Sequence, residues 1–192
     1  MKKRVGIMGG TFNPIHNGHL LIAEQAKEQM NLDEIWFMPA RIPPHKQNTG
    51  IVSVEHRVNM VNLAIADHPQ FFLSTIELDR EGPSYTVDTL EEVTATYPDF
   101  SFFFIAGGDM LTTLPKWHRF DDLVQLVQFI GFDRPGSSFE RMDSKANITY
   151  LTLPKWEISS TGIREMAKRH RSLRYLVPSS VESYIKEQKL YD

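Results

Sequence analysis

The sequence contains no cysteine. This absence excludes disulfide bonds, thiolate metal sites and cysteine nucleophiles, and it is compatible with a cytoplasmic location. Positive charge is not in excess either, since 21 Lys and Arg stand against 24 Asp and Glu, so no global basic field can hold nucleic acid by its phosphates. No apolar run is long enough for a signal peptide or a membrane span. We therefore expect a cytoplasmic protein with neither a nucleic-acid nor a membrane partner, and any phosphate must be bound by a local site.

The 192 residues are 41% hydrophobic and 23% charged, an ordinary profile for a globular protein. This length favours one domain, and no internal repeat or low-complexity linker divides it. We predict a single domain over residues 1–192, with a small C-terminal helical part from about residue 159. The sequence does not decide the oligomeric state and leaves a homodimer open.

Apolar runs of strand length alternate with segments of helical periodicity along the chain. The predicted strands are Arg4–Met8, Glu34–Pro39, Phe71–Ser74, Phe100–Gly108, Phe129–Phe132 and Ile148–Leu153. The predicted helices run from Gly18 to Met30, after a cap at Ser53, from Val87 to Tyr97, from Ser159 to about His170, and from a capping box formed by Ser179 and Glu182. This order predicts an α/β fold with a doubly wound, mostly parallel, Rossmann-like sheet and helices on both faces. Ligands of such sheets bind outside the carboxyl ends of the strands.

The segment GGTFNPIHNGH, residues 9–19, joins the first predicted strand to the first helix. It is neither a Walker loop nor the dinucleotide fingerprint, because the required lysine and the required glycine spacing are absent. It is not the zinc-protease motif, since His16 and His19 are three apart with no Glu between them. A zinc site also needs a third ligand, and the nearest candidate, His45, is followed by a lysine.

The same segment suits a phosphate group. Gly9 and Gly10 permit a close approach to the backbone, and a helix that begins near Gly18 offers free N–H groups and a favourable dipole to an anion. The imidazoles of His16 and His19 could donate to one phosphate. A single histidine would more often be a surface or capping residue, but two that flank a glycine at a strand-to-helix turn favour a functional site.

A second candidate phosphate site is ISSTGIR, residues 158–164. Three hydroxyl residues can cap a helix there, and Arg164 lies on its first turn. The free N–H groups and the guanidinium suit a polyphosphate. An ordinary serine-rich helix cap is the alternative when this segment is considered alone.

Taken together, the His-x-Gly-His turn and the ISSTGIR segment resemble the two phosphate signatures of the nucleotidyltransferase superfamily, which is shared with class I aminoacyl-tRNA synthetases. The full segment 9–19 is similar, more specifically, to bacterial nicotinate mononucleotide adenylyltransferases. The resemblance extends from about Val5 to Pro178. Members commonly carry Asp where this chain has Asn13, and they often differ at Gly162.

This resemblance implies a nucleotidyltransferase-type fold that transfers AMP from ATP to nicotinate mononucleotide, giving nicotinate adenine dinucleotide and pyrophosphate. Mg²⁺ would be bound through the ATP phosphates, with no metal site made by the protein alone. The implied catalytic residues are His16, His19 and Arg164. The implied ATP-binding residues are Gly9, Gly10, Thr11, Phe12, Gly18, Gly107, Asp109, Arg134, Ile158, Ser159 and Ser160. The implied substrate-binding residues are His45, Lys46, Ser84, Tyr85, Thr86, Trp117 and His118.

The acceptor side depends most on the resemblance. By itself, Thr86 would be assigned to a plain helix start, and Lys46 to a stiff solvent loop as readily as to a phosphate site. Trp117 is more informative, because its neighbours Lys116 and His118 are an unusual context for a buried indole. In the family, the corresponding residues bind the carboxylate and stack on the nicotinate ring.

Two other functions are weighed against this one. An adenylyltransferase for another acceptor, such as phosphopantetheine, would share the phosphate signatures but not the segments around Thr86 and Trp117. A catalytically silent nucleotide-binding module would lack turnover, and the intact His16, His19 and Arg164 argue against it. A class I synthetase is disfavoured because the chain lacks a Lys-rich second signature and an anticodon domain.

Overall fold

The computed structural model describes residues 2–41, 50–79, 85–132, 145–153 and 157–192. Its centre is a six-stranded sheet in the order β3-β2-β1-β4-β5-β6, and all of the neighbouring strands pair in parallel. The strands are β1 (Lys3–Gly10), β2 (Glu34–Pro39), β3 (Phe71–Leu73), β4 (Phe100–Gly107), β5 (Gln128–Phe132) and β6 (Ile148–Leu151). The prediction of a doubly wound parallel sheet is therefore confirmed.

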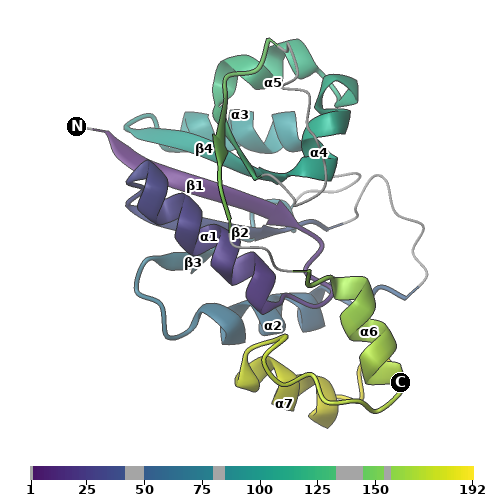
Figure 1. Ribbon diagram of the computed structural model, residues 1–192. Coiled ribbons are helices and arrows are strands. Elements are labelled where there is room, and N and C mark those ends of the chain that lie inside the picture. Colours follow the sequence, from purple (N-terminus) through teal and green to yellow (C-terminus); the bar gives the residue numbers. More distant parts are fainter. Residues whose placement is uncertain (1, 42–49, 80–84, 133–144, 154–156) are drawn as a thin grey trace.

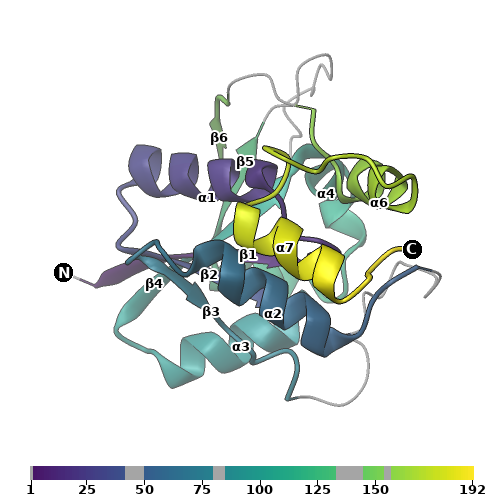
Figure 2. The same ribbon diagram turned by 90° about the horizontal axis from the view of Figure 1, so that it is seen from below.

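Helices cover both faces of the sheet (Figure 1). Those on one side are α1 (Asn17–Met30), α2 (Val54–Ile65), α6 (Ser160–Lys168) and α7 (Ser179–Glu187), and those on the other are α3 (Thr86–Thr96), α4 (Gly108–Thr113) and α5 (Phe120–Leu126). A short 3-10 turn, η1 (Leu114–Lys116), joins α4 to the segment before α5. Figure 2 shows α2 and α7 side by side, with α1 nearby. Among the described residues, no helix has the length and apolar character needed to cross a membrane.

The side chains of β4 explain why both faces need cover. Phe102 and Phe104 are buried in the core beneath α3 and α5, whereas Phe103 and Ile105 are buried in the core beneath α1 and α2. Successive residues of a strand point to opposite faces, so a run that is apolar throughout predicts a strand buried on both sides.

The strand order reverses direction next to β1, which pairs with β2 on one side and β4 on the other. In an open parallel sheet, the crevice outside the carboxyl ends at this switch point is where ligands bind. The segments that follow β1, β2 and β4 all begin at this edge.

The sequence analysis missed two helices, and one of its predictions about a helix cap was wrong. The helices α4 and α5 between β4 and β5 were not predicted, because each is too short to show a clear apolar period. The capping box at Ser179 does not form: Pro178 is the N-cap, and no side chain caps α7. Glu182 then falls one position too late to reach the cap, and it pairs with Lys186 at 2.7 Å instead.

Candidate active site

The loop between β1 and α1 is packed around an aromatic ring. Phe12 is buried with a positive φ of 49°. A Cβ on Gly10 would lie 2.9 Å from the Phe12 ring, and one on Gly18 would lie 3.0 Å from the His16 imidazole. These two glycines therefore leave room for side chains of the loop itself. By contrast, a Cβ on Gly107 at the end of β4 would meet nothing within 4 Å, so the close approach of a ligand is sterically open there.

His16 and His19 form a reciprocal cap at the start of α1. The backbone N–H of His19 donates to His16 Nδ1 at 3.3 Å, and the backbone N–H of His16 donates to His19 Nδ1 at 3.2 Å. The two rings stack with centroids 3.7 Å apart. The helix begins at Asn17 with His16 as its N-cap, one residue before the predicted start.

This cap has a chemical consequence. A nitrogen that accepts a hydrogen bond carries no proton, so the neutral form of each ring has its N–H at Nε2. Both imidazoles are therefore held as Nε2–H donors by the fold of the loop. Such fixed donors are what a developing charge on a phosphate requires.

The start of α6 is joined to the same loop. Ser159 caps α6 by accepting from the Gly162 N–H at 3.1 Å. Ser160 Oγ donates to the Pro14 carbonyl at 2.9 Å, and Arg164 Nη1 donates to the Asn13 carbonyl, also at 2.9 Å. The two predicted phosphate segments, which are far apart in the sequence, are thus in direct contact.

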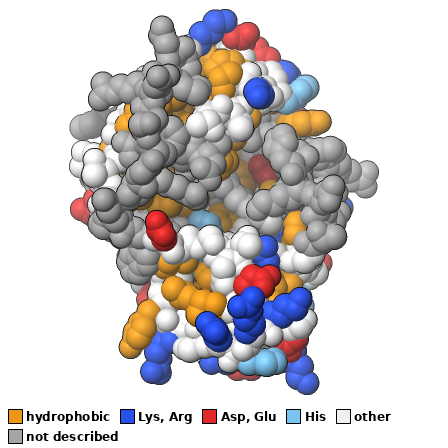
Figure 3. Space-filling view, turned by 45° about the vertical axis from the view of Figure 1, so that its right-hand side comes forward, with side chains coloured by type: hydrophobic (Ala, Val, Ile, Leu, Met, Phe, Trp, Pro, Cys, Tyr) orange, Lys and Arg blue, Asp and Glu red, His pale blue; other side chains and the backbone are white. Residues whose placement is uncertain are grey.

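Two helix N-termini therefore lie at one edge of the sheet, each with its positive dipole end and a side-chain cap. Arg164 also donates from Nη2 to Thr161 at 3.2 Å, which leaves N–H donors of its guanidinium for another partner. In Figure 3, which turns the carboxyl edge towards the viewer, Lys and Arg side chains gather on the lower part, over α6 and α7. This edge is suited to an anion with several phosphates.

Four of the predicted acceptor residues are described, and they lie on the other side of the sheet: Tyr85, Thr86, Trp117 and His118. The rings of Tyr85 and His118 are 4.4 Å apart, so the structure brings the start of α3 and the segment after η1 together. Trp117 is half-buried, with its ring 5.9 Å from Phe104 in an edge-on contact. The N-cap of α3 is Tyr85, whose side chain makes no cap hydrogen bond. The start of a helix offers backbone N–H groups, and Thr86 stands at this start, a position that suits a carboxylate.

Arg119 was missed by the sequence analysis. It has a left-handed φ of 51° and pairs with Asp88 at 3.4 Å, with Asp122 at 2.7 Å and with Glu91. The guanidinium lowers the pKa of the Glu91 carboxyl through this hydrogen bond. Arg119 thereby ties the segment that contains Trp117 to α3. Ion pairs between such distant residues leave no pattern in a single sequence.

Two residues behind the loop between β1 and α1, the predicted phosphate loop, were missed as well: Arg57 is buried and Tyr191 is partly buried. Arg57 on α2 is 1% exposed, and Tyr191 donates from its hydroxyl to Asn13 Oδ1 at 3.0 Å. Burial raises the pKa of the Tyr191 phenol. Arg57 stands in a helix segment that reads as polar, EHRVN, so only the packing reveals its role.

Several predicted site residues cannot be placed. His45, Lys46, Ser84 and Arg134 lie outside the described residues, and the side chain of Asp109, at the start of α4, is not described either. Thr11 and Ile158 lie in the two segments already discussed.

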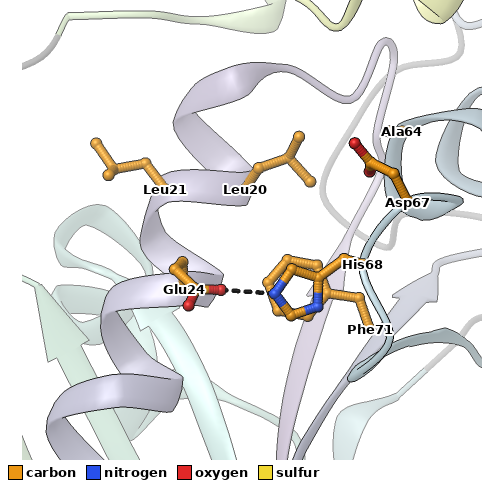
Figure 4. Close-up of a pocket in the computed structure, with 7 residues that line it drawn as sticks. All are labelled: Leu20, Leu21, Glu24, Ala64, Asp67, His68 and Phe71. Atoms are coloured by element: carbon orange, nitrogen blue, oxygen red, sulfur yellow. Dashed lines mark ion pairs between the residues drawn. The ribbon is translucent and has the colours of Figure 1, made fainter.

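Two surface cavities lie on the side of the sheet that carries α1, α2 and α7, and Asn17, next to His16, lines the second of them. One, of about 430 Å³, is formed by α1 and the α2–β3 turn, where His68 and Glu24 are paired at 2.9 Å (Figure 4). Its lining residues are Leu20, Leu21, Glu24, Ala64, Asp67, His68 and Phe71. The second, of about 460 Å³, adjoins the start of α7. Neither is lined by a predicted site residue.

Comparison with known proteins identifies the class of protein that has this fold and this site. Residues 7–166 match the cytidylyltransferase-like family, and the chain belongs to that family. The fold is also that of a Plasmodium falciparum nicotinic acid mononucleotide adenylyltransferase solved as a complex with NaAD, with a TM-score of 0.85, 24% identity, and coverage of 99% of this chain and 98% of that one.

Relatives of similar sequence identify the particular kind of enzyme within this family. The chain is 48% identical over 190 residues to the nicotinate-nucleotide adenylyltransferase of Bacillus subtilis, covering 99% of each chain. It is also 48% identical over 188 residues to the probable nicotinate-nucleotide adenylyltransferase of Geobacillus thermodenitrificans, covering 98% of this chain and 86% of that one. The protein is a member of the nicotinate-nucleotide adenylyltransferases.

Proposed function

We propose that the protein transfers AMP from ATP to nicotinate mononucleotide, giving nicotinate adenine dinucleotide and pyrophosphate in NAD biosynthesis. Membership of the adenylyltransferase family supports this reaction. The observation that carries it is the direct contact of two capped helix starts, because Ser160 and Arg164 bond to the carbonyls that precede the His16 and His19 cap.

The reaction needs no protein nucleophile. An oxygen of the mononucleotide's 5′-phosphate attacks the α-phosphorus of ATP. The bond from this phosphorus to the oxygen that bridges the α- and β-phosphates breaks, and pyrophosphate leaves with the electron pair of that bond. Phosphoryl-type transfer of this kind is catalysed mainly by positioning and by stabilisation of charge. The Nε2–H groups of His16 and His19 supply fixed donors for the α-phosphate. Arg164 and the start of α6 would bind the β- and γ-phosphates.

The acceptor would bind next to α3. The backbone amides at Thr86 and the imidazole of His118 would donate to the nicotinate carboxylate, and Trp117 would stack on the ring. His45 and Lys46 are assigned to the phosphate of the mononucleotide. Ser84 and Tyr85 would complete this side, while Gly107, Asp109 and Arg134 are assigned to ATP.

Magnesium is proposed as a companion of ATP. Among the described residues, no three His, Asp or Glu side chains group closely enough to hold a metal ion. Mg²⁺ keeps several waters and is commonly bound by substrate phosphates. When bound, it would neutralise charge on the ATP phosphates, and the residues named above would orient those phosphates.

The test is release of pyrophosphate from ATP with a panel of acceptors. Nicotinate mononucleotide should support turnover, whereas phosphopantetheine should not. Turnover with phosphopantetheine alone would favour the other adenylyltransferase activity, and ATP binding without turnover on any acceptor would favour a nucleotide-binding module. Sizing of the same preparation decides between a monomer and the homodimer left open by the sequence.

A further inference from the structure

Arg57 holds three backbone carbonyls in the interior of the protein. From α2, its Nη1 donates to the Thr11 carbonyl at 2.9 Å and to the Ala40 carbonyl at 2.8 Å, and its Nη2 donates to the Arg41 carbonyl at 3.2 Å. The side chain is 1% exposed. It therefore touches no substrate and can act only through the backbone that it binds.

A buried guanidinium without a carboxylate partner is costly. None of the ion pairs found among the described residues includes Arg57, and burial lowers the pKa of its guanidinium. Taking such a charge out of water is unfavourable, and the carbonyl dipoles offset this penalty only if their geometry is good. The planar fork of arginine can bind three carbonyls from two chain segments, whereas a lysine ammonium is a compact point charge.

The three carbonyls belong to two segments that follow neighbouring strands at the functional edge of the sheet. Thr11 follows β1 and opens the loop that carries the histidine cap, whereas Ala40 and Arg41 follow β2. The two segments are also joined directly, because the Ala40 N–H donates to the Gly10 carbonyl at 2.9 Å. Arg57 therefore sets the spacing between the ends of two neighbouring strands at the functional edge.

Asn13 makes the matching tie at the other end of the β2–α2 connection. Its Nδ2 donates to the Gly50 carbonyl at 2.9 Å, and its Oδ1 accepts from the Val52 N–H at 3.2 Å. Both the exit from β2 and the entry to α2 are thus bonded to residues 11–13. These hydrogen bonds join buried side chains to backbone atoms, so an inspection of the sequence for catalytic residue types does not reveal them.

We propose that Arg57, with Asn13 as its counterpart, is a positioning residue for the transfer reaction. It fixes the distance between the loop after β1, on the ATP side, and the segment after β2, on the acceptor side. This inference rests on the proposed adenylyl transfer, in which the attacking phosphate oxygen must be aligned with the α-phosphorus. Misplacement by about 1 Å can cost on the order of 10²-fold in rate.

The test replaces Arg57 by lysine and uses Arg4 as a matched control. Arg4 also donates from its guanidinium to two backbone carbonyls, those of Asn31 at 3.2 Å and Met30 at 3.0 Å. It does so near the amino end of β1, away from the functional edge. Arg57→Lys and Arg4→Lys are therefore the same chemical change, one made beside the carboxyl end of β1 and the other near its amino end.

Three quantities are measured for each variant: kcat, the Kd of each substrate bound alone, and Tm. We expect Arg57→Lys to lower kcat by about 10-fold or more, while the Kd of ATP and the Kd of the mononucleotide each change by less than about threefold, because each loop keeps its own contacts. Arg4→Lys should lower Tm but leave kcat unchanged. A purely structural role for Arg57 would move Tm alone.

Three results would overturn the inference: normal kcat in Arg57→Lys, loss of binding in place of loss of kcat, or an equal loss of kcat in Arg4→Lys. If Arg57→Lys does not fold, Asn13→Ala is read in the same way, and normal kcat in that variant overturns the inference. Failure of the unmodified protein to form any dinucleotide would instead refute the proposed function, so the two failures are distinguishable.

Discussion

The phosphate loop after β1 and the Trp117–Arg119 segment lie at the same edge of the sheet, but the fold holds them differently. The phosphate loop is fixed by partly buried hydrogen bonds from Arg164 and the histidine cap and by those of Arg57, whose side chain is 1% exposed. The Trp117–Arg119 segment is held by exposed ion pairs of Arg119. Buried bonds are costly to leave unmade, whereas exposed ion pairs contribute little and are screened by salt.

The difference suggests a division of labour. The side proposed to bind ATP is built as a rigid frame in which donors are preorganised for charge that develops during the reaction. The side proposed to bind the acceptor is formed by a half-buried indole, an exposed histidine and a helix start. Changes to the first side should therefore reduce kcat or raise the KM for ATP, and changes to the second should mainly alter acceptor binding and selectivity.

The largest loss of activity is expected in the variant His19→Ala. Loss of one preorganised donor typically lowers kcat by about 10²–10³-fold, and the variant also loses half of the reciprocal cap. Steady-state kinetics at saturating substrates measure the loss. His68→Ala, at the surface cavity beside α1, is the control and should leave kcat unchanged.

His19→Gln separates the two roles of this residue. A glutamine at the third helical position can restore the cap, so Tm should recover towards that of the unmodified protein while kcat does not. Near-normal kcat in either variant would remove His19 from the transfer step.

The second effect concerns the choice between nicotinate and nicotinamide mononucleotides. In the proposed pocket, donors at Thr86 and His118 would satisfy two carboxylate oxygens, but one of these donors would face the NH₂ group of an amide. Because the bound ring would cover these donors, leaving one of them unpaired should lower kcat/KM for the amide by about 10²-fold or more. Trp117→Ala should weaken both forms about equally, because stacking does not distinguish them. Comparable kcat/KM for acid and amide would contradict the assignment of Thr86 and His118.

Arg164→Ala should raise the KM for ATP by about tenfold, the magnitude expected for a charged hydrogen bond, and much more than it raises the KM for the mononucleotide. Arg164→Lys keeps the charge without the fork and should recover only part of the loss. If the mononucleotide suffers more than ATP, the two sides of the site are assigned the wrong way round.

Arg119→Gln tests the acceptor side. It removes three exposed ion pairs and loosens the tie between α3 and Trp117, so the KM for the mononucleotide should rise by about two- to fivefold. The KM for ATP should not change. Lys145→Gln, which breaks an exposed pair with Asp121 on α5, is the control. A change in ATP binding would break the proposed separation of the two sides.

The smallest effect is a change in the pH dependence of stability in Tyr191→Phe. Burial raises the pKa of Tyr191 in the folded protein, whereas the unfolded chain has the ordinary value near 10. The unfolded state therefore loses a proton first, and the stabilisation present below about pH 10 declines as the pH rises above it. Above this pH, the Tm of Tyr191→Phe should fall less steeply with pH than the Tm of the unmodified protein. Parallel plots of Tm against pH would contradict a raised pKa of Tyr191.

Much of the architecture follows from patterns that one sequence contains. Glu34–Pro39 was predicted with the bounds that the structure has, and the strand that begins at Phe100 ends one residue earlier than expected. Apolar runs and the alternation of strand and helix patterns are local signals, so they can be recognised without tertiary information. Ser179 shows the limit: its spacing to Glu182 fits a capping box, but the helix start at Pro178 moves both residues out of register.

The candidate site was predictable where residue type and spacing carry chemistry. His16 and His19 were found as a pair, although their reciprocal cap depends on the conformation of the loop. Arg57 and Arg119 could not be found, because their roles come from contacts with segments that are distant in the sequence. Such residues become visible only when packing places a charge beside its partners.

The most direct test is incubation of the purified protein with ATP, Mg²⁺ and nicotinate mononucleotide, with chromatographic detection of the dinucleotide and a parallel assay of pyrophosphate. We predict nicotinate adenine dinucleotide and pyrophosphate in equal amounts, and their loss together in His19→Ala. Pyrophosphate without dinucleotide, or adenylylation of phosphopantetheine in place of nicotinate mononucleotide, would contradict the proposed function.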